Sequence, residues 1–317
     1  MPAQLICMGH GGLMNVSSLL ETADLDAVDG EIEKARLAIR QSPPDLVVKF
    51  GNDHNSGFSL TLMPAFLVAM RARCLGDFGT SDGAMSVNGE LARALVRQLH
   101  EAGVDVATSY DALFDHGMAM ALDRLFGGID QVPVIPVFTN CGGDLRPPLK
   151  RSLALGEAVG AFCRNHCGDR TVMFIGSGGL SHDPPLPEYE TSPEEVRQRM
   201  INGTQWTPEL LALRTQRVTD AGRQHGLGEG DLKPLNPDWD AKMMAAFADG
   251  ALESIAQQDD AAVIRLGGRG GSEIRNWLAA FAALRAYGNG PYHLAQSFYR
   301  PLPAWITGWA LMRAQSA

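Results

Sequence analysis

The amino-acid sequence predicts an α/β fold, with a single large domain built on a mostly parallel or mixed central sheet that helices flank. Two observations lead to this prediction. Short apolar segments alternate along the chain with longer segments whose apolar residues recur every three or four positions, which is the pattern of strands that alternate with amphipathic helices. The chain also has 317 residues, of which 45% are hydrophobic, enough to bury a sizeable core.

The first half of the chain supplies most of the predicted elements. Gln4–Met8 and Leu46–Phe50 are short apolar strands, and the apolar positions between them follow the spacing of one helix face. Those positions are Leu25, Val28, Ile32, Ala35 and Ile39. The following elements are a helix marked by Leu91, Leu95 and Leu99, strands at Val104–Ala107 and Val132–Phe138, a helix marked by Leu155, Val159 and Phe162, and a strand at Thr171–Ile175.

The character of the chain changes after residue 188. From about 188 to 258 it is charged, rich in helix-forming residues and nearly without strand patterns, which predicts a helical insertion packed on the sheet domain. Ala261–Leu266 then has strand-like composition, and a long helix is expected from about Ser272 to Tyr287. Neither repeats nor low-complexity linkers are present, so we expect one unit over residues 1–317.

Net charge argues against two kinds of partner, and the cysteine content and the apolar runs indicate the compartment. Asp and Glu number 36 against 27 Lys and Arg, a net charge of −9, which argues against binding to nucleic acid or to an anionic membrane. Five cysteines without a framework-like spacing are typical of a reducing compartment. The first residues lack a basic segment, and no apolar run approaches the roughly 20 residues that span a bilayer. We therefore expect a cytoplasmic protein without a signal peptide.

Four of the eight histidines share one position relative to the predicted strands. His10, His54, His116 and His182 each follow a strand within a short loop. In an open α/β sheet, the loops beyond the carboxyl ends of the strands converge on the ligand crevice. A shared site is one interpretation of this pattern; ordinary neutral histidines in surface loops are the other.

The neighbours of these histidines favour a metal site. Gly11 and Gly12 follow His10 and leave room for an ion and a substrate. Asp53 and Asp115 directly precede His54 and His116. Such an aspartate is suited to accept a hydrogen bond from a ring N–H and so to orient the imidazole; alternatively it caps the helix that follows.

Two glycine-rich segments do not fit nucleotide-binding motifs. In the first, residues 176–182, Ser181 stands where the dinucleotide pattern requires Gly or Ala, and Pro184 and Pro185 prevent the helix that would receive a pyrophosphate. The second, residues 267–272, lacks the lysine of a P-loop. Both are expected to be tight turns that let the backbone approach a small site.

Glu273 directly follows the second glycine-rich turn and is predicted in the first turn of the last long helix. Acidic residues are common at that position because they interact favourably with the helix dipole. A carboxylate that joins two histidines at a site with open positions would instead favour Fe(II) and oxygen chemistry. The sequence pattern alone leaves both interpretations open.

Taken together, the motifs of the chain resemble those of the class III extradiol dioxygenases, and the resemblance covers almost the whole chain. Their order and number make it specific. The matching segments are Gly9-His10, Asp53-His54 with Gly57-Phe58, Gly76-Asp77-Phe78-Gly79, Asp115-His116-Gly117, Gly176 to His182, Pro234-Leu235-Asn236-Pro237, Glu273-Ile274, Trp277, Ala279 to Ala283 and Tyr299-Arg300-Pro301.

The resemblance implies the roles of the site residues. His10, His54 and Glu273 would be the ligands of Fe(II), and His116 and His182 would be the catalytic acid–base pair. The implied reaction is extradiol cleavage of a catechol-like ring with O₂, in a homo-oligomeric enzyme. Because Gly11-Gly12 and Asn55 depart from the family pattern beside the metal histidines, the ring substituent stays open between a propionate, a carboxylate and a heteroatom.

Two other functions use the same residues. One is a zinc-dependent hydrolase on the same ligands, and the other is a binding module of the same fold without catalysis. An acidic dioxygenase that acts on a carboxylated catechol also needs a local cation. Arg269, Arg275 and Arg300 are the candidates, with ordinary surface arginines as the alternative.

Overall fold

Eight strands form a mixed sheet at the centre of the protein, in the order β10-β11-β1-β9-β2-β8-β3-β6. The computed structural model describes residues 3–143 and 145–317. Met1 and Pro2, which belong to the N-terminal segment that we do not expect to be a signal peptide, lie outside the described residues. The strands are β1 (Gln4–Met8), β2 (Leu46–Gly51), β3 (Phe66–Ala69), β6 (Ala107–Ser109), β8 (Val134–Thr139), β9 (Val172–Ser177), β10 (Tyr292–Leu302) and β11 (Thr307–Ser316).

The directions of the strands confirm the predicted α/β fold with a mixed central sheet. Strands β1, β9, β2 and β8 run parallel to one another, whereas β11 pairs antiparallel with β1 and with β10, and β3 pairs antiparallel with β8. The four parallel strands are buried along their whole length, as expected for a sheet with helices on both faces. Their carboxyl ends therefore meet at one edge of the sheet.

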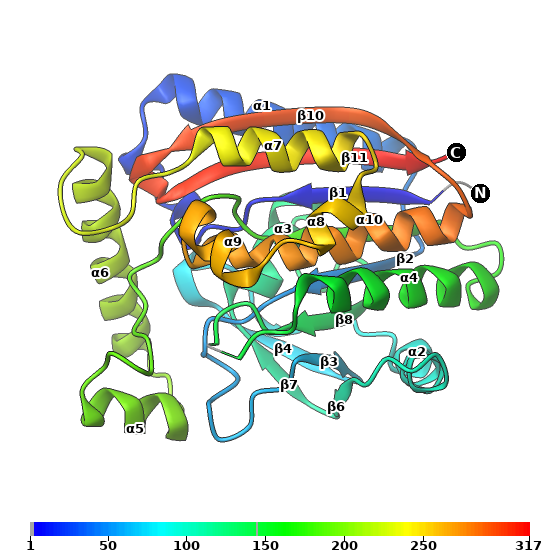
Figure 1. Ribbon diagram of the computed structural model, residues 1–317, viewed down its shortest axis with the longest axis horizontal. Coiled ribbons are helices and arrows are strands. Elements are labelled where there is room, and N and C mark those ends of the chain that lie inside the picture. Colours follow the sequence, from blue (N-terminus) through cyan, green and yellow to red (C-terminus); the bar gives the residue numbers. More distant parts are fainter. Residues whose placement is uncertain (1–2, 144) are drawn as a thin grey trace.

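Helices cover both faces of the sheet (Figure 1). One face carries α2 (Gly89–Glu101), α4 (Leu149–His166), α7 (Pro237–Ala248), α8 (Leu252–Ala256) and α10 (Ile274–Gly288). The other carries α1 (Thr22–Gln41) and α3 (His116–Phe126). None of the helices among the described residues combines the length and apolar composition that a membrane span requires.

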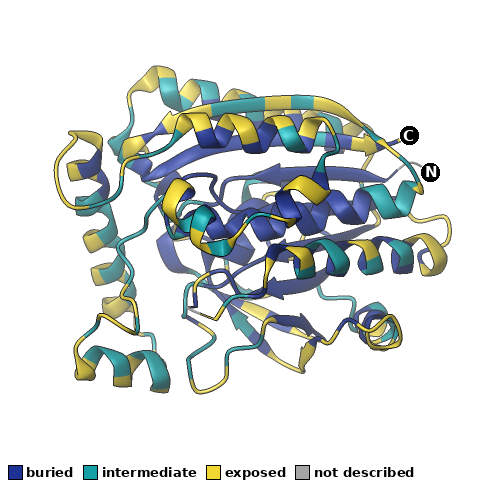
Figure 2. Cartoon of the chain, viewed as in Figure 1, coloured by how far each residue is buried: buried dark blue, intermediate teal, exposed yellow. Residues whose placement is uncertain are grey.

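Helix α10 is the most deeply buried helix of the first face (Figure 2). All residues from Ile274 to Leu284 are buried. It lies close to α4, where a Cβ on Gly156 or Gly160 would come within 2.2 Å of the carbonyl oxygens of Ala279 and Ala283. Only glycine allows this approach, so α10, with Glu273 just ahead of its first residue, is fixed firmly against α4.

The remaining elements surround the carboxyl edge of the parallel strands. Residues 194–226 form α5 (Glu194–Asn202) and α6 (Pro208–Gly226), which extend along one side of the molecule (Figure 1). Helix α6 packs on short 3₁₀ helices, chiefly η1 (Gly12–Asn15), η3 (Asp77–Gly79) and η5 (Pro303–Trp305). A small sheet contains β5 (Asp82–Ala84), β4 (Ala72–Leu75) and β7 (Ala112–Phe114).

Most predicted elements of the first half are present, with bounds close to those expected. The strand predicted at Ala261–Leu266 is wrong, because this segment lies within the helix α9 (Asp260–Gly267). Asp259 caps that helix by accepting a hydrogen bond from the Ala262 N–H, and Val263 and Gly267 are its buried residues, four positions apart. The strand predicted at Val104–Ala107 begins only at Ala107, as β6.

Candidate metal centre

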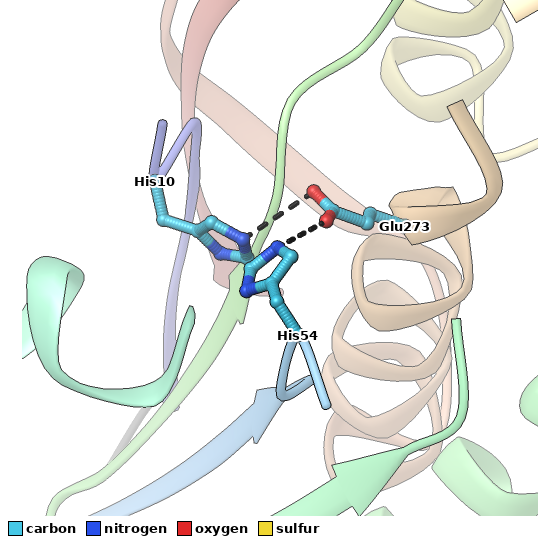
Figure 3. Close-up of side chains that lie close together, drawn as sticks. All are labelled: His10, His54 and Glu273. Atoms are coloured by element: carbon cyan, nitrogen blue, oxygen red, sulfur yellow. Dashed lines mark hydrogen bonds and ion pairs between the residues drawn. The ribbon is translucent and has the colours of Figure 1, made fainter. Parts of the chain in front are cut away.

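Three predicted ligands come together at the carboxyl edge of the sheet: His10, His54 and Glu273 (Figure 3). His10 follows β1, His54 follows β2, and Glu273 ends the 3₁₀ helix η4 (Gly270–Glu273) just before α10. One potential ligand atom from each lies within 4.8 Å of the others. Nε2 of His10 is 3.4 Å from Oε2 of Glu273, and Nε2 of His54 is 3.1 Å from Oε1.

Neighbouring backbone and amide groups hold the Glu273 carboxylate in place. The N–H of Gly179 donates to Oε2 at 3.0 Å, and Nδ2 of Asn52 donates to Oε1 at 3.0 Å. Gly178, with φ of +149°, lies directly against this side chain, and a Cβ built on it would be 2.5 Å from Cβ of Glu273. The glycine-rich turn after β9 therefore approaches the site as closely as the sequence suggested.

Gly178→Ala is expected to weaken metal binding by roughly 10- to 100-fold, because the new methyl group displaces Glu273. Metal affinity is measured by competition with a chelator. Gly168→Ala is the matched control, since Gly168 also has positive φ (+59°) but open space around its Cβ position. The control should lower the unfolding midpoint and leave metal affinity unchanged. An unchanged affinity in Gly178→Ala would contradict the close fit of the turn against Glu273.

The histidines are oriented as metal ligands require. Nδ1 of His10 lies 3.0 Å from Oγ of Ser177, and Nδ1 of His54 lies 3.2 Å from the Asp115 carboxylate. Both rings therefore present Nε2 to Glu273. Nε2 of His10 is buried without a hydrogen-bond partner, which an ion at this position would satisfy. Two histidines and one carboxylate match the ligand set of non-haem iron sites with open coordination positions.

Electrostatics also suit a cation. Burial lowers the pKa of His10 to about 4, so its ring stays neutral and Nε2 is free to bind an ion. Burial disfavours ionised Glu273, but His10 and His182 outweigh it and hold the pKa of the carboxyl well below its usual range. Burial likewise opposes a charge on His54, yet Asp115 and Glu273 raise its pKa well above the usual value. The negative charge that attracts this proton would equally attract a metal ion.

A second group, His54, Asp115 and His116, has atoms as close together as the first. It is the weaker candidate, because the Asp115 carboxylate already accepts hydrogen bonds from other groups. The donors are the backbone N–H of His54 at 2.8 Å, Oγ of Ser56 at 2.8 Å and the N–H of Gly117 at 2.9 Å. We therefore assign Asp115 to the orientation of His54.

The other two predicted histidines, His116 and His182, line one pocket together with His10 and His54. His116 is the first residue of α3, and its ring stacks on that of His54 with 4.4 Å between centroids. Its backbone N–H donates to Oδ1 of Asp77 at 2.7 Å, and its Nδ1 lies 2.7 Å from Oδ2. The ring is thus fixed with Nε2 as the free nitrogen.

The ring of His182 is held between glycines. Its Nδ1 donates to the carbonyl of Leu180 at 3.2 Å, which leaves Nε2 3.5 Å from Oε2 of Glu273. A Cβ on Gly179 would lie 2.7 Å from its Nδ1, and a Cβ on Gly270 would lie 2.0 Å from its Nε2. Burial disfavours the charged ring, but Glu273 and the Leu180 carbonyl outweigh it and raise the pKa of His182.

The pocket contains a cation that the sequence did not suggest. Among the described residues that line it, Arg214, from α6, is the only arginine, and there is no lysine. Arg269 instead pairs with Asp183 and Glu188, the buried Arg275 pairs with Asp260, and Arg300 pairs with Asp24. None of these three lines the pocket, so their proposed role beside the substrate is corrected.

Two further assignments from the sequence change. Asp53 does not orient His54; it accepts hydrogen bonds from the backbone N–H groups of Ser56, Gly57 and Asp115 and so shapes the loop. Asp77, not Asp115, is the close partner of the His116 ring, at 2.7 Å against 3.9 Å. The sequence offered one signal for Asp77, its place in the turn Gly76-Asp77-Phe78-Gly79, where Phe78 adopts a left-handed φ of +50°.

Known proteins resemble this chain along its whole length. Residues 4–309 match the family described as the catalytic LigB subunit of aromatic ring-opening dioxygenase. A 2,3-dihydroxyphenylpropionate/2,3-dihydroxicinnamic acid 1,2-dioxygenase of Rhodococcus jostii is 39% identical over 314 residues, which are 99% of this chain and 98% of the relative. A protein of the same name from Cupriavidus pinatubonensis is 40% identical over 321 residues, 100% of this chain and 99% of the relative.

The fold also resembles a solved structure. An uncharacterized protein from Escherichia coli K12 superposes with a TM-score of 0.50 at 14% sequence identity, over 99% of this chain and 100% of that protein. This likeness concerns the fold alone.

Proposed function

The chain belongs to the family of LigB catalytic subunits of aromatic ring-opening dioxygenases, and from this premise we propose that it is an Fe(II)-dependent extradiol dioxygenase of a catechol with a short carboxylated side chain. Its activity as a ring-cleaving dioxygenase follows from the family. The observation that carries the finer proposal is the meeting of His10, His54 and Glu273, together with the pocket that His10 and His54 line with His116 and His182.

In this proposal the metal ligands are His10, His54 and Glu273, and a ferrous ion held by them would supply the electron transfer that lets dioxygen react with a catechol. The protein's own histidines move the protons. Nε2 of His116 is suited to take a proton from a catechol hydroxyl, because Nδ1 is committed to Asp77. Nε2 of His182 is suited to donate a proton as the oxygen–oxygen bond breaks, because Nδ1 donates to Leu180.

Arg214 supports a carboxylated substrate. Both substrates in the relatives' printed name, 2,3-dihydroxyphenylpropionate and 2,3-dihydroxicinnamic acid, carry a carboxylate. The guanidinium of Arg214 lies over the rings of Phe78 and Trp206, 5.4 and 5.1 Å from their centroids. Its contacts with Asp77 and Asp115 are loose, at 3.5 and 3.7 Å. In a protein of net charge −9, this local cation would attract and orient an anionic side chain.

Arg214→Met is expected to lower the preference for a carboxylated catechol by roughly 10- to 100-fold, which corresponds to one lost charge-assisted hydrogen-bonded pair. The preference is the ratio of kcat/KM for 2,3-dihydroxyphenylpropionate to kcat/KM for 3-propylcatechol. This ratio cancels any general loss of rate that follows from the contacts of Arg214 with Asp77 and Asp115.

Arg269→Met is the matched control for this experiment, because Arg269 is also near the site but is paired with Asp183 and Glu188. The control should keep the preference of the unaltered protein. If Arg214→Met kept it as well, Arg214 would have no part in recognition of the carboxylate.

Oxygen uptake tests the proposed reaction. The metal-free protein is loaded with Fe(II) without air and then given O₂ with catechol, 2,3-dihydroxyphenylpropionate or 2,3-dihydroxypyridine. We expect one O₂ consumed for each catechol ring opened, with the carboxylated catechol preferred. The ring bond that breaks should join a hydroxyl-bearing carbon to a neighbour without a hydroxyl group. Cleavage of the bond between the two hydroxyl-bearing carbons, or no uptake with any of these compounds, would contradict the proposal.

A further inference from the structure

A lysine lies buried in the middle of the central sheet. Lys49 of β2 has no exposed surface. Its Nζ donates to three acceptors, the carbonyls of Phe50 at 3.2 Å and Gly117 at 3.5 Å and the hydroxyl of Ser177. In the described part of the chain no carboxylate lies within ion-pair distance of it. Burial lowers its pKa to about 7.

The surroundings of Lys49 are shaped to hold its amine. A Cβ on Gly51 would lie 3.0 Å from Nζ of Lys49 and 3.1 Å from the carbonyl oxygen of Gly117, so the glycine leaves room for the amine and its acceptor. Burial of an amine without a paired anion costs stability, and an apolar side chain of similar size would avoid that cost. A role other than stability is therefore the better explanation for the lysine.

The hydrogen bonds of Ser177 connect Lys49 to a metal ligand. Oγ of Ser177 donates its single proton to the carbonyl of Gly117 at 2.9 Å and accepts a hydrogen bond from Nζ of Lys49. Its remaining lone pair faces Nδ1 of His10 at 3.0 Å. Since the hydroxyl has no second proton to give, Nδ1 of His10 must be the donor. Nε2 of His10 is then unprotonated, and this is the buried nitrogen without a hydrogen-bond partner beside Glu273.

We propose that Lys49 is a positioning residue for the metal centre, which acts through Ser177 to fix His10 as the Nδ1–H tautomer with Nε2 free to bind the metal. This inference rests on the metal site proposed above. Outer hydrogen-bond partners that set the tautomer of a ligand histidine typically change metal affinity by about 10- to 100-fold when they are removed.

Lys49→Met tests the inference through two readouts that should move in different directions. The dissociation constant of Co(II), followed by its visible absorption, should rise by about 10- to 100-fold. The unfolding midpoint of the metal-free protein should stay the same or rise, because the buried amine is gone. Val47→Ala is the matched control, since Val47 is a buried residue on the same face of β2; it should lower the midpoint and leave Co(II) affinity unchanged.

The double variant tests the path through Ser177. Ser177→Ala should weaken Co(II) binding as Lys49→Met does, and the combination should weaken it little further, because both interrupt the same hydrogen-bonded path from Lys49 through Ser177 to His10. Fully additive losses would overturn the role of Ser177 as the link. A Lys49→Met protein with unchanged Co(II) affinity would overturn the proposal itself.

A measurement on the unaltered, metal-free protein does not depend on whether any variant folds. With ¹⁵N-labelled histidine, nuclear magnetic resonance distinguishes the two ring tautomers, and the His10 signals are identified by their loss in His10→Gln. We expect His10 to be neutral with its proton on Nδ1. A proton on Nε2 would overturn the proposal even if metal binds normally. If the unaltered protein bound no metal, the proposed metal site would fail, while this spectrum would still decide how His10 is held.

Discussion

His182→Gln is expected to bind Fe(II) and catechol nearly as the unaltered protein does, yet to turn over roughly 10²- to 10⁴-fold more slowly. The ring of His182 is fixed between Gly179 and Gly270 with Nε2 toward the site. In our account it moves a proton and is not a metal ligand. Iron content, catechol affinity without air, the unfolding midpoint and the single-turnover rate are measured on the same preparation.

A histidine remote from the pocket serves as the control for this variant. His100 lies in α2 and has its Nε2 3.1 Å from the carbonyl oxygen of Val106. His100→Gln should leave the single-turnover rate unchanged. Loss of iron in His182→Gln would make His182 a ligand. An unchanged rate with a lowered unfolding midpoint would make it a structural residue of the glycine-rich turn and remove it from the mechanism.

Glu273→Ala should abolish iron binding and all ring cleavage while the protein stays folded. The carboxylate is the only negative group of the proposed ligand set, and it faces both histidines at 3.4 and 3.1 Å. It lies at the end of η4, ahead of the helix whose apolar residues form the core. His10→Ala and His54→Ala should have the same result, because each removes one of three ligands.

The measurement is iron content after loading and gel filtration, together with the circular dichroism of the folded protein. Glu253→Ala is the control, because this carboxylate pairs with Arg285 at the surface, and it should keep full iron content and turnover. If Glu273→Ala also kept both, Glu273 would not be the carboxylate ligand.

Much of the fold could be predicted from sequence because the parallel strands are short apolar runs between amphipathic helices. The C-terminal strands β10 and β11 were not predicted. Strand β11 lies between β1 and β10 and is buried on both faces, so its sequence lacks the alternation typical of a half-buried strand. The segment of α9 was predicted as a strand because its β-branched residues outweighed the cap at Asp259.

The site was predictable to the extent that its signals are local in the chain. His10, His54 and His182 follow strands of the central sheet, whose carboxyl ends meet at one edge, whereas His116 follows β7 of the small sheet. The other groups depend on tertiary placement. Arg214 reaches Ser56 across 158 positions of sequence, and Lys49 reaches Ser177 across 128. A lysine within an apolar strand was nevertheless a visible signal, because an unpaired amine is rarely buried.

The most direct test of the account follows both atoms of oxygen into the product. The metal-free protein is loaded with Fe(II) or with Zn(II), supplied with 2,3-dihydroxyphenylpropionate under ¹⁸O₂, and the products are analysed by mass spectrometry. We predict a ring-opened product that carries two ¹⁸O atoms, formed only by the Fe(II) protein; the readily exchanged carbonyl oxygen is preserved by rapid quenching and reduction. Equal turnover with zinc, or a product without ¹⁸O, would contradict this prediction and favour a hydrolase on the same ligands.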